Sequence, residues 1–293
     1  MHQLLTAVFE PGFFASPQVH VAVSIGAVVA VVSAVTGVFT VMRGQSFAGH
    51  ALGDVSAAGG SGALLIGLTP LPGFVGAGIA GAGVMDMIGV QRLRGRDLAT
   101  GIVRGAGLGL GALFLYWDTT HTTTTGATIT ILFGSMFTIN TSVIPVVAAF
   151  GLAAVGIVAA LYRPLLLSSA SSDLAVVRGV RVRATGALCL AAIALAVSLA
   201  ALTIGAILST ALLVGPAATA LRLTARPGLV MIWSAAIGLA ATWLGILLAF
   251  DSYYWPSARQ GWPVSFFVVS LVLIFYLLTL MRPAARGATP GRG

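Results

Sequence analysis

The chain contains about nine runs of predominantly apolar residues, each long enough to cross a lipid bilayer as a helix. The hydrocarbon core of a bilayer is roughly 30 Å thick, and a helix needs about 20 residues to span it. Backbone polar groups find no partner in lipid, so such segments fold as helices. We therefore predict an all-α, polytopic membrane helix bundle with about eight or nine transmembrane helices. The runs cover 19–42, 46–68, 71–91, 98–117, 142–162, 184–203, 204–221, 229–250 and 262–281.

Composition excludes a soluble protein of this length. Hydrophobic residues make up 58% of the 293 residues and charged residues only 8%, whereas soluble domains carry about 25% charged residues. A further apolar segment, 126–138, is too short to cross and predicts a re-entrant or broken helix. We expect 1–293 to form one transmembrane domain with a short cytoplasmic tail at 282–293, and no cleaved signal peptide. The single cysteine, Cys189, allows no disulfide within the chain.

The arginines predict the orientation of the bundle, because positive residues collect on the cytoplasmic side of a membrane. With nine alternating spans, nearly all of them fall on one side, and only Arg259 falls on the other. Arg104, about two turns into the fourth span, leans toward the majority. We therefore expect the N-terminus outside and the C-terminus inside. The majority comprises Arg43, Arg92, Arg94, Arg96, Arg163, Arg178, Arg181, Arg183, Arg222, Arg226, Arg282, Arg286 and Arg292.

The net charge of +8 is explained by this topology and by contact with anionic inner-leaflet lipid, so no nucleic-acid partner is predicted. Aromatic residues support the same orientation. Tyr116 and Trp117, the run at 253–255 and Trp262 occur where an outer interfacial belt of aromatic side chains is expected.

Two ionisable residues, His50 and Asp54, occur inside the second apolar run. Ionisable groups in a membrane span are costly and usually functional. The two are four residues apart, so they share one helical face. An imidazole and a carboxylate together suit Zn²⁺, Mn²⁺ or Fe²⁺, with further ligands from water or other helices. The alternative is a hydrogen-bonded pair that only fixes helix packing.

The other acidic residues fall in predicted loops or near span ends, where solvation explains them. Asp86 could pair with Arg92 or lie near the interface. The segment WDTTHTTTTG contains Asp118 and His121 on the predicted outer side. We predict that this segment is a solvated loop; the alternative is that Asp118 and His121 capture a metal ion.

Four segments resemble the zinc/manganese-type permeases of ABC transporters. RGQSFAGHALGDVSAAGGSGALLIG resembles the second-span signature of that family, and RGRDLATGIV and ILFGSMFTINTSVI resemble two later segments. ALTIGAILSTALLVGPAATALRL is the most specific match, to a segment ending in PAATA. The matches occur in order over about residues 43–222. Phosphate-binding GxxxxGK[ST] is not found in the sequence, so ATP hydrolysis would come from a partner.

The resemblance implies the permease subunit of a metal importer in a bacterial inner membrane, and not an enzyme. Its partners would be a second permease copy, two cytoplasmic ABC ATPase subunits and an extracellular metal-binding protein. The metal would be cargo, with no tightly bound cofactor. In this family an aspartate, and a histidine four residues later, line the metal pathway near the outer gate. They match His50 and Asp54 here, in exchanged order, and because the two ligand types are kept we expect the metal role to be kept.

Two further segments, at 59–62 and 163–183, allow predictions of local structure and of a contact with a partner. The glycines of GGSG at 59–62 would permit a broken helix beside a polar pathway, or close packing of helices through small residues. The loop at 163–183 contains residue types that favour a helix N-cap, followed by apolar residues. By resemblance it is the coupling helix that contacts the ATPase: Ala175 and Gly179 match small-residue positions of the family, whereas Ser171 stands where the family has an aspartate. Ser171 and Asp173 are the N-cap residue types, and an amphipathic interfacial segment is the alternative.

Two other classes of function compete with the importer. A secondary transporter could use His50 and Asp54 as an ion or proton relay, although no inverted repeat is evident. A membrane enzyme with a metal site would need more histidines and acids than the chain offers.

Overall fold

The computed structural model describes residues 13, 16–90, 93–121, 126–134, 136–253 and 261–281, and within these ranges it contains helices and no strand. This confirms the all-α prediction. The α-helices are α2 (Pro17–Met42), α3 (Ser46–Leu65), α4 (Pro70–Ile88), α5 (Leu93–His121), α6 (Ala127–Phe133), α7 (Ile144–Ala160), α8 (Tyr162–Ala170), α9 (Ser172–Val177), α10 (Val182–Ile204), α11 (Ser209–Leu223), α12 (Pro227–Ser252) and α13 (Val264–Leu280), with a 3₁₀ turn at Thr141–Val143 before α7.

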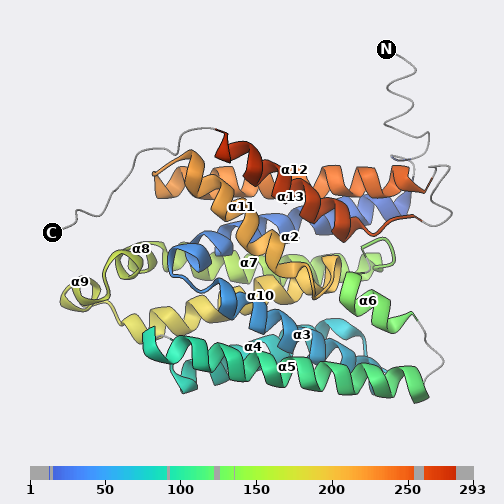
Figure 1. Cartoon of the computed structure of the whole chain (residues 1–293), viewed down its shortest axis with the longest axis horizontal. Coiled ribbons are helices and arrows are strands. Elements are labelled where there is room, and N and C mark those ends of the chain that lie inside the picture. The colour runs from blue at the N-terminus through green and yellow to red at the C-terminus, as the bar shows by residue number, and fades with distance from the viewer. Residues whose placement is uncertain are drawn as a thin grey trace, which may run out of the picture.

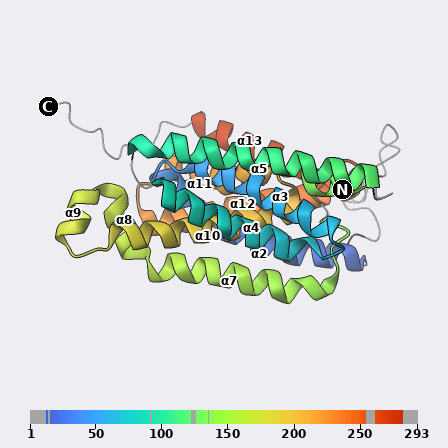
Figure 2. The same ribbon diagram turned by 90° about the horizontal axis from the view of Figure 1, so that it is seen from below.

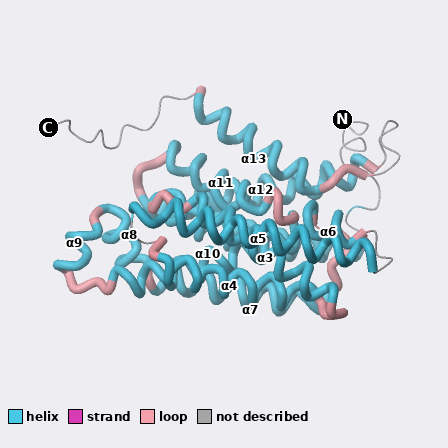
Figure 3. The backbone as a smooth tube through the Cα atoms, turned by 60° about the horizontal axis from the view of Figure 1, so that its bottom comes forward, coloured by secondary structure: helices cyan, strands magenta, loops and turns pink. Residues whose placement is uncertain are grey.

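Nine of these helices match the nine predicted spans, and they run along one long axis with their connections at the two ends (Figures 1 and 3). Among the described residues, six helices are long and apolar enough to cross a membrane: α2, α4, α5, α7, α10 and α12. The other three helices do not meet this criterion of length and apolar composition, for different reasons. Helix α3 contains the polar residues of the candidate site, α11 has 15 residues and α13 has 17.

The core of the bundle is built around α10 and α2. Nearly every residue of α10 from Cys189 onward is buried, and α2 is buried along most of its second half. Helices α11, α12 and α13 pack together on the α2 side, whereas α3, α4 and α5 form a second group joined to α10 (Figure 1). Helix α7 packs against α2 and α10 on another side, opposite α5 in the view of Figure 2.

The short segment after residue 126 forms a helix that ends inside the bundle, as predicted. Gly134 ends α6 with a φ of +86°, and Gly205 ends α10 with a φ of +99°. A Cβ atom at either glycine would collide with backbone atoms of the other turn. The N–H of Ala206 donates to the carbonyl of Ile131 at 3.0 Å. The two helix ends therefore interlock backbone to backbone, and α11 restarts at Ser209.

The GGSG segment packs closely and is not broken, because α3 is continuous through 59–62. A Cβ at Gly59 would collide with the carbonyl of Gly73 on α4, and a Cβ at Gly73 would collide with that of Gly59. Of the two expectations for these glycines, close helix packing through small residues is the one that the structure confirms.

The helix ends that carry arginines lie at one end of the bundle, together with α8 and α9 (Figure 1). Arg43 donates to the hydroxyl of Ser168 at 2.9 Å, and Arg96 donates to the carbonyl of Gly44 at 3.2 Å. We call this the arginine end. Its position on the cytoplasmic side stays a prediction. Several expected residues lie outside the described part of the chain: Arg92, Arg259, Arg282, Arg286, Arg292, Tyr254, Trp255 and the tail 282–293.

Gly59→Ala tests the contact between α3 and α4. The new Cβ would meet backbone, which cannot rotate away, so the helices would have to separate. We expect a loss of about 1–3 kcal/mol in the free energy of unfolding, measured by thermal melting in detergent. The matched control is Gly76→Ala on α4, where a Cβ would meet nothing within 4 Å. Equal melting of the two variants would contradict the packing.

Candidate functional site

Helix α3 presents His50 and Asp54 on one face, and a tight turn fixes where that helix begins. Gly44 has a φ of +63°, a backbone conformation that favours glycine. The N–H of Gln45 donates to the carbonyl of Thr40 at 2.8 Å, and Gln45 itself is buried. Because α3 starts at Ser46, His50 lies about one turn and Asp54 about two turns from its N-terminus.

His50 is oriented by a hydroxyl from α11. Its Nδ1 lies 2.6 Å from Oγ1 of Thr210, the second residue of that helix. Histidines that bind metals usually have one ring nitrogen held by such a hydrogen bond, while the other nitrogen is the ligand. With Nδ1 engaged by Thr210, Nε2 is the nitrogen of His50 that can ligate a metal ion.

Asp54 forms an ion pair with Arg104 of α5. The Nε of Arg104 donates to Oδ2 of Asp54 at 3.1 Å, and the side chains are 38% and 11% exposed, respectively. His50 and Asp54 therefore bond to two different neighbouring helices. The alternative expectation was that His50 and Asp54 bond to each other and only fix helix packing. Instead, each of them bonds to a side chain of another helix.

The sequence interpretation missed the partners Arg104 and Thr210. For Arg104 a signal was present: it is a basic residue about two turns inside a predicted span, at a depth similar to that of the only acid well inside one. Opposite charges buried in a membrane are usually paired. Thr210 gave no signal, because hydroxyl residues are common in membrane helices and commonly bond to their own backbone.

A groove of about 410 Å³ lies on the surface beside this pair. Its lining comes from α3, α5 and α11, so it brings together three helices that are far apart in sequence. The chemically active groups in it are the His50 imidazole, the Arg104 guanidinium and two hydroxyls. Its lining residues are Ser46, Phe47, His50, Arg104, Thr210, Ala211 and Val214.

The pair lies in the half of α3 that is nearer the arginine end. The resemblance implied a position near the outer gate. If the arginine end is cytoplasmic, His50 and Asp54 instead lie in the inner half of the membrane. No group of three or more His, Cys, Asp or Glu side chains that could hold a metal ion occurs among the described residues. A metal bound by His50 and Asp54 would need further ligands from water or another chain.

The segment with Asp118 differs from the solvated loop that was expected. Residues 117–121 form the last turn of α5, and Asp118 is buried at 4% exposure. Asp251, near the end of α12, is also buried at 5%. The side chain of His121 lies outside the described part of the chain, so the structure neither supports nor opposes joint metal capture with Asp118. Asp86 lies in the last turn of α4.

The hairpin of α8 and α9 extends from the arginine end (Figure 2). The hydroxyl of Ser171 accepts from the N–H of Leu174 at 3.3 Å, so the expected N-cap is present. Ala175 is buried, and Gly179 has a φ of +77°. The exposed apolar side chains are Leu174, Val176 and Val177 at 60%, 61% and 82%.

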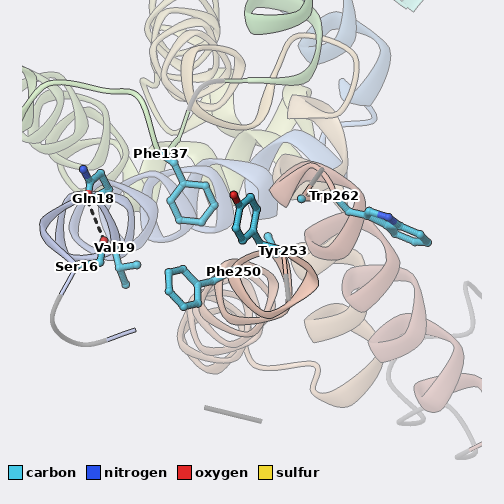
Figure 4. A pocket seen from close by; sticks show the side chains of 9 residues that line it. Ser16, Gln18, Val19, Phe137, Phe250, Tyr253 and Trp262 are labelled. Atoms are coloured by element: carbon cyan, nitrogen blue, oxygen red, sulfur yellow. Dashed lines mark hydrogen bonds between the residues drawn. The ribbon is translucent and has the colours of Figure 1, made fainter. Parts of the chain in front are cut away.

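Aromatic side chains gather at the opposite end of the bundle. Phe137, Phe250 and Tyr253 face a hollow of about 330 Å³ next to the start of α2 (Figure 4). Tyr253 and Trp262 are 66% and 45% exposed. Their location agrees with an interfacial belt at the end away from the arginines.

The model of the ABC 3 transport family matches residues 16–282. The chain belongs to the ABC 3 transport family. It is 26% identical over 255 residues to the manganese transport system membrane protein MntC of Listeria innocua, covering 87% of each chain. It is also 26% identical to the manganese import system permease protein ScaB of Streptococcus parasanguinis, covering 76% of this chain and 78% of that one.

Two solved structures have the same fold. PsaBC from Streptococcus pneumoniae, determined in complex with Fab, aligns with a TM-score of 0.77 and 23% identity over 92% of this chain and 93% of that one. An inward-facing putative metal-chelate type ABC transporter aligns with a TM-score of 0.72 and 15% identity, covering 93% and 88%. Family membership and fold confirm a polytopic helical membrane protein of the ABC transporter permease type.

Thr210→Val tests whether the hydroxyl orients His50. Valine keeps the shape of threonine but cannot hydrogen-bond to Nδ1, so the ring would lose its fixed orientation. Loss of such a supporting bond typically weakens metal binding by about 10–100-fold. We expect a weakening in that range for Mn²⁺ binding to the purified protein, with Thr210→Ser close to wild type. Equal affinities for the valine and serine variants would contradict the role of the hydroxyl.

Proposed function

We propose that this chain is the transmembrane permease subunit of an ABC importer for a divalent transition metal ion, with manganese as the leading cargo. The observation that carries the proposal is the His50–Asp54 face of α3, in a bundle of the ABC 3 transport family. The imidazole is held by Thr210 so that Nε2 can be a ligand, and the Asp54 carboxylate lies one turn farther along. Imidazole and carboxylate suit Mn²⁺, Zn²⁺ and Fe²⁺. The names of the relatives favour manganese among these.

On this proposal, the metal pathway requires a second copy of the chain. Two protein ligands leave most of the coordination sphere of a metal open, and the groove beside them lies at the surface of one copy. A second permease copy facing this groove would supply another His50 and Asp54. Two cytoplasmic ABC ATPase subunits would drive transport, and an extracellular metal-binding protein would deliver the ion. The assembly belongs in a bacterial inner membrane, with the N-terminus outside and the arginine end cytoplasmic.

The α8–α9 hairpin is the proposed contact with the ATPase. Leu174, Val176 and Val177 expose apolar surface at the end where the arginines predict cytoplasm, and a partner protein would cover them. Ser171 and Asp173 begin α9, with Ser171 as its cap. Ala175 supports the hairpin from inside, and Gly179 completes the turn that follows. The small size of Gly179 is required by its positive φ, whether or not a partner packs against it.

His50→Gln and Asp54→Asn test the metal path. Both amides can keep a hydrogen bond to Thr210 or Arg104, but they are poor ligands for a transition metal. We expect each to lower the uptake of Mn²⁺ at least about tenfold, in vesicles that contain the permease, its ATPase and its binding protein. Melting temperatures should change little, because the contacts between helices are retained.

The matched control is Ser61→Ala on α3, which removes a hydroxyl bonded only to the carbonyl of Ala57 in the same helix. It should transport normally. Uptake at the wild-type level by both amide variants would end the metal-path proposal. Uptake without ATP that follows a proton gradient would favour the secondary transporter instead. Competition by Zn²⁺ and Fe²⁺ in the same assay ranks the candidate cargoes.

Val177→Asp tests the ATPase contact. A carboxylate at this 82% exposed position would be desolvated if a partner covered it, at a cost of several kcal/mol. We expect loss of ATPase binding or of ATP-driven uptake, with normal assembly in the membrane, because the residue has few contacts in the chain itself. Val177→Thr, which keeps the shape, serves as the control. Normal coupled uptake by Val177→Asp would exclude this surface as the contact.

A further inference from the structure

Arg104 is the one feature near His50 and Asp54 that does not suit a path for a cation. Its guanidinium lines the groove and occupies the carboxylate that a metal would need. The formal charges of Asp54 and Arg104 sum to zero. A divalent ion that enters the groove therefore meets no net attraction until the ion pair opens.

The packing of α5 on α3 explains why Arg104 reaches Asp54. A Cβ at Gly107 would collide with the backbone of Asp54 and Val55, so the two helices touch closely at this level. The close approach of the two backbones thus places the guanidinium within reach of the carboxylate. An unpaired carboxylate in a membrane span is costly, so the pair stabilises the empty pathway.

The same helix leaves room for the side chain to move away. A Cβ at Gly101 or Gly105 would meet nothing within 4 Å, so the surface of α5 beside Arg104 is open. The side chain of Arg104 is 38% exposed, whereas that of Asp54 is 11% exposed. Of the two partners, the arginine is the one that can leave, since its long stem can lie along the helix surface.

We propose that Arg104 is a tethered counter-cation: it neutralises Asp54 while the path is empty, and the arriving divalent metal displaces it. This rests on the proposed function. The metal then binds Asp54 and Nε2 of His50, while the guanidinium moves into the open space over Gly101 and Gly105. When the metal leaves, Arg104 returns to Asp54. The internal cation therefore lowers the affinity for the metal and speeds its release.

Arg104→Gln tests the displacement by a binding measurement that needs no transport. The full chain in lipid nanodiscs is titrated with Mn²⁺, and the free ion is followed by its electron paramagnetic resonance signal. Glutamine can still donate a hydrogen bond to Asp54 but brings no competing charge. We expect the Kd to fall on the order of tenfold, as for direct coupling between neighbouring groups. The maximal rate of uptake should fall, because release slows.

The control is Arg226→Gln, which removes the same charge from an exposed position at the start of α12 and should leave the Kd unchanged. In an Asp54→Asn background, Arg104→Gln should no longer tighten binding. If the glutamine variant does not assemble, Arg104→Lys replaces it. Its shorter stem holds the competing charge less well, and a smaller tightening is expected.

An unchanged or weaker Kd for Arg104→Gln, or for Arg104→Lys where that variant is used, would overturn the proposal. Loss of Mn²⁺ binding would overturn it as well, because Arg104 would then support the metal site instead of competing with the ion. Failure of the proposed function gives a different result, since the wild-type protein would then neither bind Mn²⁺ nor import it.

Discussion

A carboxylate two turns inside an apolar helix must be paired or coordinated, and the arrangement of α3, α5 and α11 follows from that requirement. Asp54 meets Arg104 from α5 at 3.1 Å, and His50 meets Thr210 from α11 at 2.6 Å. The two ionisable side chains of α3 thus bind two different helices. The polar face joins the group of α3, α4 and α5 to α11, which packs on the other side of the core. One helix therefore connects the two halves of the bundle at the site.

Such contacts require helices that approach closely, and glycines permit the approach. Gly59 and Gly73 bring α3 and α4 together, Gly107 brings α5 against α3, and Gly37 lies against the backbone of α11. Packing is the main source of stability between helices in lipid, because lipid tails are as apolar as the side chains. The small residues thus place α5 close enough for Arg104 to reach Asp54. Fold and site depend on the same short interhelical distances.

The sequence predicted the helices well, since long apolar runs leave the backbone no alternative in a membrane. It also predicted the short α6 and the break near Gly205. It could not predict the continuity of α3 through GGSG, because glycine permits both a break and a close contact, and only the position of α4 decides. Asp118 was assigned to a loop because polar residues follow it, but α5 extends one further turn and buries its side chain.

The candidate site was predicted only as residues on one helix. His50 and Asp54 share a face as their spacing requires, but their partners come from helices about 50 and 160 residues farther along the chain. Such pairings depend on tertiary packing, which local periodicity does not contain. The depth of the pair did follow from the sequence, because the second apolar run was predicted to begin at 46, where α3 begins. For the α9 segment, the sequence predicted the Ser171 cap and the apolar residues that follow it, and the structure shows that these side chains are exposed.

The most direct test of the account is to locate the metal itself. Crystals of the permease grown with Mn²⁺ and measured at the manganese absorption edge would show the ion as an anomalous peak. The account predicts a peak within coordination distance of His50 Nε2 and an Asp54 carboxylate oxygen, with the Arg104 guanidinium moved away from Asp54. A peak elsewhere in the bundle, or manganese bound while the Arg104–Asp54 pair stays intact, would contradict it.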